Sequence, residues 1–123
     1  MELRSPEELR QYVDLDRAEV VDERARGGEV ILIPLLNQFA PAPALAAIAD
    51  NLAWFMEQVT GRGYQKAEEV YGVGFVVREP GHQAFGLKVQ AEGPMVVISR
   101  VSILEDETVF RRYVNYLHTG IFL

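Results

Sequence analysis

The sequence predicts a single α+β domain that spans residues 1–123, with a five-stranded antiparallel sheet, a central amphipathic helix and a C-terminal helix. Three observations predict this class. Apolar residues recur every three or four positions between residues 41 and 61, which is the period of a helix with one buried face. Alternating apolar segments follow, separated by turns that contain proline and glycine. Helical spacing returns near the end of the chain.

Length and composition limit the function classes. The chain has 123 residues, no cysteine and a net charge of −6. This length suits one domain with its own core, and the negative charge disfavours binding to nucleic acid, whose affinity depends on lysine and arginine. No apolar run reaches the roughly 18–20 residues that a membrane span needs, and the first residues do not resemble a signal peptide. We therefore expect a cytoplasmic protein that binds neither nucleic acid nor membranes.

The first elements are predicted from capping and turn residues. Ser5 is expected to cap a helix that has Pro6 at its first position and ends near residues 14–16. Residues 18–23 and 29–36 have the composition of two strands, and a pair of glycines between them favours a turn.

The central helix is expected over residues 41–61. Gly61 is placed where a helix commonly ends in a left-handed residue. The predicted buried stripe consists of Leu45, Ile48, Ala49, Leu52, Phe55, Met56 and Val59. The predicted polar side carries Asp50, Asn51, Glu57 and Gln58.

Trp54 does not fit this division, because its position falls on the polar side of the central helix. A large aromatic ring there needs a partner. Either another element of the same chain covers the ring, or the ring contacts another protein, since tryptophan is enriched at the energetic centres of interfaces.

The second half of the chain is predicted to form a three-stranded meander. A loop at residues 61–67 leads into strands at residues 69–78, 83–91 and 95–102, with proline–glycine turn signatures between them.

The last helix is expected over residues 105–118. Acidic residues at its start favour the positive end of the helix dipole, and Gly120 is placed to end it. The predicted buried stripe is Val109, Phe110, Tyr113, Val114 and Leu117. Tyr116 falls off this stripe and is expected to be exposed.

The resulting order, α-β-β-α-β-β-β-α, is similar to that of roadblock/LC7 and profilin-like domains. The similarity concerns topology alone and implies a sheet covered by helices. It implies no function, because one fold serves many functions.

No motif specifies a reaction. His82 is expected in a solvated turn, and His118 in the last turn of the final helix, where a cation offsets the dipole. Ser102 and His118 lie at opposite ends of that helix, about 20 Å apart at 1.5 Å per residue, so they do not form a nucleophile–base pair. We expect no cofactor, no metal and no enzymatic activity.

Two main functional hypotheses remain, with a hydrolase as a third possibility. The preferred one is a non-catalytic interaction or assembly module that forms a homodimer. Its candidate interface residues are Trp54, Glu57, Tyr116, Ile121, Phe122 and Leu123. The alternative is a small-molecule sensor with a pocket between the sheet and the central helix. Its candidate pocket residues are Arg62, Lys66, Gly72, Gly74, Gly86 and Arg100.

Overall fold

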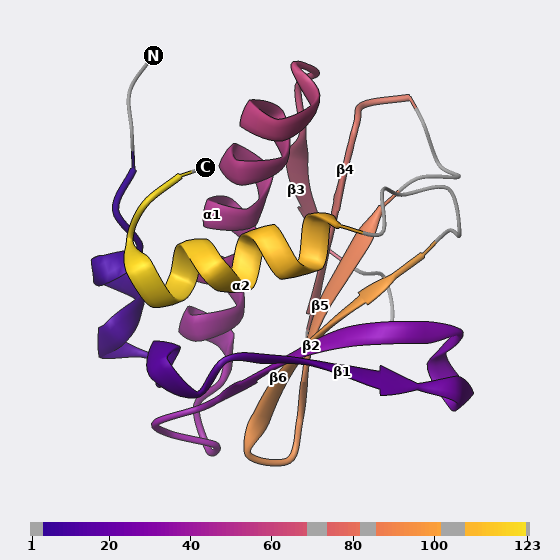
Figure 1. Ribbon diagram of the computed structural model, residues 1–123. Helices are drawn as coiled ribbons and strands as arrows, with labels where there is room; N and C mark the ends of the chain where they lie inside the picture. Colours follow the sequence, from indigo (N-terminus) through magenta and orange to yellow (C-terminus); the bar gives the residue numbers. More distant parts are fainter. Residues whose placement is uncertain (1–3, 69–73, 82–85, 102–107, 123) are drawn as a thin grey trace.

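A computed structural model describes residues 4–68, 74–81, 86–101 and 108–122 of the chain (Figure 1). Within these residues the fold is α+β with one antiparallel sheet, as predicted, and it has two α-helices where the sequence predicted three. The sheet has six strands in the order β1-β2-β6-β5-β4-β3. The strands are β1 (Glu19–Glu23), β2 (Gly28–Pro34), β3 (Gln65–Glu68), β4 (Gly74–Arg78), β5 (Leu87–Glu92) and β6 (Met95–Arg100).

The predicted number of five strands is wrong, because the segment at residues 61–67, expected to be a loop, contributes most of β3. This strand is polar and lacks an apolar alternation. Among the described strands it pairs with β4 alone, at the edge of the sheet, where Lys66 lies opposite Val77. The additional strand therefore depends on pairing with a neighbour and not on a hydrophobic pattern of its own.

The predicted first α-helix is also wrong, since short 3-10 turns take its place: η1 (Pro6–Gln11) and η2 (Leu15–Arg17). A third turn, η3 (Arg24–Arg26), connects β1 to β2. Ser5 does cap η1, because its hydroxyl accepts a hydrogen bond from the Glu7 amide at 3.2 Å. Val13 then forms a β-bridge with Leu35, which draws the chain out of helical geometry.

Helix α1 (Ala42–Thr60) confirms the predicted central helix. Gly61 ends it with a positive φ of 72°, and its amide donates a hydrogen bond to the Glu57 carbonyl. Six of the seven residues of the predicted stripe are fully buried, and Val59 is half-buried. Their partners include Val77, Leu87 and Val89 on the sheet, all fully buried.

Helix α2 (Val109–Thr119) covers the same face of the sheet as α1, and its axis runs across that of α1 (Figure 1). Its predicted buried stripe is confirmed, and Gly120 ends it with a φ of 74°. The expected start at residues 105–107 lies outside the described residues, as do residues 69–73, 83–85 and 102 of the predicted meander strands. Helix α1 packs mainly over β3, β4 and β5, whereas α2 packs over β1 and β2.

Candidate functional site

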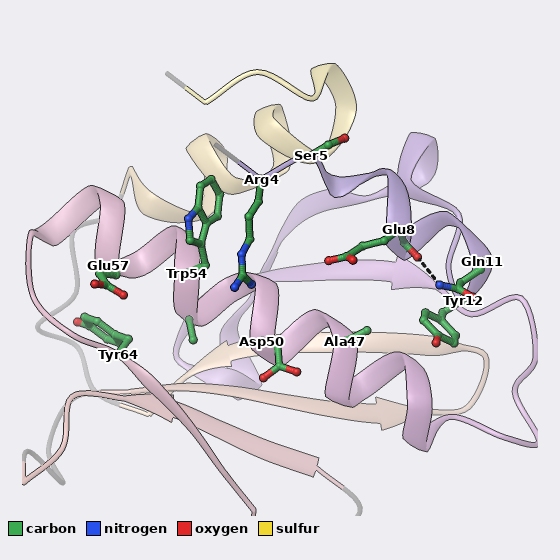
Figure 2. Close-up of a pocket in the computed structure, with 11 residues that line it drawn as sticks. Arg4, Ser5, Glu8, Gln11, Tyr12, Ala47, Asp50, Trp54, Glu57 and Tyr64 are labelled. Carbon is green, nitrogen blue, oxygen red and sulfur yellow. Dashed lines mark hydrogen bonds between the residues drawn. The ribbon is translucent and has the colours of Figure 1, made fainter. Parts of the chain in front are cut away.

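A surface groove separates the N-terminal segment from the outer side of α1 (Figure 2). Its volume is about 730 Å³. We call it the η1–α1 groove. It lies on the side of α1 that faces away from the sheet. The lining residues are Arg4, Ser5, Glu8, Gln11, Tyr12, Ala47, Asp50, Ala53, Trp54, Glu57 and Tyr64.

Buried anchors hold the N-terminal wall of the groove in place. Pro6 and Leu9 of η1 are buried, and Leu9 has no exposed surface. The carbonyl oxygen of Arg4 accepts a hydrogen bond of 2.6 Å from the Tyr116 hydroxyl of α2. The Gln11 side chain donates to the Glu8 carbonyl at 3.0 Å. These contacts position a wall that is polar where it faces the groove.

Trp54 forms part of the opposite wall and is half-buried. Its ring packs against Tyr116 and Phe122, with centroid distances of 5.6 and 5.9 Å. The intramolecular covering that we considered for Trp54 is therefore present, but it is partial, because the ring also lines the groove.

Three polar side chains connect the two helices beneath the groove. Tyr113 donates to the Asn51 oxygen at 2.8 Å, and the Asn51 nitrogen donates to the Tyr116 hydroxyl at 3.3 Å. Asn51 is 1% exposed. Burial raises the pKa of Tyr113 well above its ordinary value, and the neighbouring Tyr116 adds to the shift. Burial also raises the pKa of Tyr116, while the hydrogen bond from Asn51 partly offsets it.

Two expectations about these residues are corrected. Tyr116, expected to be exposed, is buried, with 1% of its surface accessible. Its ring packs against Trp54, and its hydroxyl forms hydrogen bonds with the Asn51 side chain and the Arg4 carbonyl. Asn51 belongs to the buried side of α1 and not to its polar side. Its position three residues after Ile48 and four before Phe55 places it beside the apolar stripe, a spacing that sequence reasoning could have used.

Of the acidic side chains that line the groove, Asp50 has an ion-pair partner, whereas Glu8 and Glu57 have none in the described part of the chain. Asp50 forms an ion pair with Lys66 at 3.2 Å, and Lys66 also lies 5.0 Å above the Phe75 ring. Glu8 and Glu57 are exposed, and no ion pair joins either of them to another side chain in the described part of the chain. Figure 2 shows the Arg4 side chain extending into the groove, between Trp54 and Glu8 in this view.

The C-terminal residues of the candidate interface lie beside Trp54. Phe122 is half-buried and contacts both Trp54 and Phe55. Ile121 is 57% exposed, and its amide donates to the Thr119 hydroxyl at 3.1 Å, which orders this segment. Leu123 lies outside the described residues. Ile121, Phe122 and the Trp54 ring are called the tail patch below.

The cationic candidates for a pocket under α1 are dispersed. Arg62 lies 3.8 Å from Glu79. Arg100, on β6, places its guanidinium carbon 4.6 Å from the centroid of the Phe110 ring. The strands β5 and β4 separate Arg100 from Lys66, which lies on β3. These three cations therefore do not face one anionic ligand.

Gly86, one of the glycine candidates, leaves no space for a ligand. A Cβ atom on Gly86 would lie 3.1 Å from Val76 Cγ1 and 3.3 Å from the Val77 carbonyl. Gly74 is buried within β4, and Gly72 lies outside the described residues. Val77, Leu87 and Val89 of the sheet are fully buried in the core with α1, whereas Phe75 is partly buried. The groove on the opposite side of α1 is therefore the better place for a ligand.

His118 and the acidic side chains are candidate catalytic or metal-binding groups in the described part of the chain. The His118 Nε2 donates to the Ala18 carbonyl at 2.7 Å, which accounts for this ring structurally; His82 and Ser102 lie outside the described residues. Where the chain is described, no group of three or more acidic or histidine side chains is placed to hold a metal ion. None of the described helices has the length and apolarity that a membrane span requires.

Comparisons with protein-family models, characterised proteins and solved structures find no match to this chain. The similarity of element order to roadblock/LC7 and profilin-like domains therefore stays a prediction.

Proposed function

We propose that the chain is a non-catalytic interaction module that assembles as a homodimer through the tail patch. The observation that carries this proposal is the state of Trp54. Its ring is fixed from one side by Tyr116 and Phe122 but is not enclosed. A rigid, partly exposed tryptophan loses little conformational entropy on binding and is a frequent interface anchor.

The tail supplies apolar surface next to this anchor. Ile121 is one of four large apolar residues that are at least half exposed in the described part of the chain. Single exposed residues of this kind are ordinary. Ile121, however, adjoins Phe122, which contacts Trp54, so a two-fold contact between tail patches would bury apolar surface from both copies.

Solution mass, measured by light scattering over a concentration series, tests the proposal. We expect a dimer for the unmodified chain and a shift toward monomer for Ile121→Asp, which places a charge in the contact. Phe39→Asp is the matched control, because Phe39 is 89% exposed on the loop before α1. A monomer at every concentration, or a dimer that only Phe39→Asp disrupts, would contradict the proposal.

A second candidate function is small-molecule binding in the η1–α1 groove. The groove volume of about 730 Å³ falls within the range of about 300–1,000 Å³ typical of ligand sites. A thermal-shift screen tests this candidate, since a ligand that binds only the folded chain raises its melting temperature. Shifts that persist after groove substitutions would place the ligand elsewhere.

A further inference from the structure

We infer that the η1–α1 groove binds an arginine or lysine side chain of an extended segment in a partner protein. The inference deepens the proposed interaction function, on which it rests, by naming the chemistry of a partner. The groove and the tail patch share the Trp54 ring, but Glu57 lines the groove and Ile121 belongs to the tail patch, so variants of these two residues let the two proposals fail separately.

The wall of the groove suits a cation that has lost part of its water. The face of a tryptophan attracts guanidinium and ammonium groups more strongly than other aromatic rings. Trp54, held by Tyr116 and Phe122, presents such a ring, and Tyr12 and Tyr64 add aromatic surface to the lining.

Charge complementarity points to the same occupant. Three carboxylates line the groove, against the single guanidinium of Arg4. Lys66 neutralises Asp50 through their ion pair, so Glu8 and Glu57 remain available to a cation from outside. Glu57 follows Trp54 by three residues on the helix, which places its carboxylate on the same side of α1. The whole chain carries a charge of −6, which favours the approach of a basic segment.

The chain's own Arg4 shows that the groove admits a guanidinium. Its side chain enters the groove in Figure 2, while its carbonyl oxygen, and not its side chain, bonds to Tyr116. A partner's arginine must therefore compete with Arg4 for the same space. Removing the Arg4 side chain should then tighten binding without loosening the N-terminal segment.

Fluorescence of Trp54 gives a direct readout, because it is the only tryptophan in the chain. The probes are a ten-residue glycine–serine peptide with three arginines and the same peptide with three glutamates. We expect saturable binding of the arginine peptide, weakened by salt as exposed charge contacts are. We expect no binding of the glutamate peptide.

Matched variants place the contact. Glu57→Lys should weaken binding about tenfold, which corresponds to about 1.4 kcal/mol. Glu19→Lys changes the net charge equally, at an exposed position of β1, and should have little effect. Arg4→Ala should tighten binding several-fold.

Three outcomes would overturn the inference: no binding of the arginine peptide, equal weakening by both lysine variants, or weaker binding after Arg4→Ala. Binding of the glutamate peptide would reassign the groove to an anionic partner. If the unmodified chain still forms the dimer disrupted by Ile121→Asp, the proposed interaction function survives any of these failures.

Discussion

The two sides of α1 differ in how completely their side chains are buried and paired within the chain. On the inner side, Phe55 is fully buried against Tyr113, and Asn51 finds its partners within the chain. On the outer side, Trp54 is half covered and Glu57 is exposed. The comparison indicates that the inner side of α1 determines folding, and the outer side is where we propose that binding occurs. Substitutions on each side should separate these two properties.

The largest expected effect is on the inner side. Phe55 is fully buried and contacts the rings of Tyr113, Tyr116 and Phe122 at 5.0–5.6 Å. Phe55→Ala should lower the free energy of unfolding by about 3–5 kcal/mol, because it leaves a cavity. Urea denaturation followed by circular dichroism measures the loss. A loss below about 1 kcal/mol would mean that the ring is not central to the core.

The buried polar network comes next. Asn51→Leu removes the acceptor for the Tyr113 hydroxyl and should lower the free energy of unfolding by about 1–3 kcal/mol. Asp50→Asn is the control one residue away on the outer side. It weakens only the ion pair with Lys66, which should contribute less than about 1 kcal/mol. Equal effects of the two variants would remove the distinction between the sides.

The tyrosines give the inner side a pH dependence. Their pKa values are raised in the folded chain, so the folded state holds its protons while the unfolded state loses them near pH 10. These two tyrosines should therefore leave the stability unchanged below about pH 10 and lower it as the pH rises above that value. Tyr113→Phe removes one titrating group and should make this fall shallower. Denaturation at several alkaline pH values measures the slope, and an unchanged slope would exclude Tyr113 as a cause.

The smallest effect on stability is expected on the outer side. Glu57→Lys should change the free energy of unfolding by no more than about 0.5 kcal/mol, as exposed substitutions usually do. The same variant should weaken binding of the arginine peptide about tenfold. Thermal denaturation supplies the first quantity. A melting temperature that falls as far as that of Asn51→Leu would show that Glu57 supports the fold instead.

Sequence periodicity was sufficient for the elements that bury a face. The stripes of α1 and α2 and the terminating glycines Gly61 and Gly120 are confirmed because each residue type has a strong local reason for its place. Strand β3 is not predicted because its pairing with β4 determines it. The turns η1 and η2 are predicted wrongly as one helix because the bridge between Val13 and Leu35 determines the path of the chain there. Such long-range pairing leaves no local pattern.

The candidate site was predictable only in part. The position of Trp54 on the polar side of its helix identified one wall of the groove. The other wall comes from Arg4 and Glu8, which a sequence alone does not bring to α1. The glycine-lined pocket under α1 could not be judged from composition, because neighbouring strands decide the space beside a glycine, as Val76 does beside Gly86. The interface roles of the tail and the groove stay predictions.

Backbone amide exchange, measured at low and high protein concentration, tests most directly whether the outer side of α1 and the tail are a surface for interactions. Protection at higher concentration is expected to rise in residues 50–57 and 117–122, with little change in β2 and β6, which the fold already protects. A rise confined to the edge strands β1 and β3, or to the loop around Phe39, would contradict the account and place the interface on a different surface.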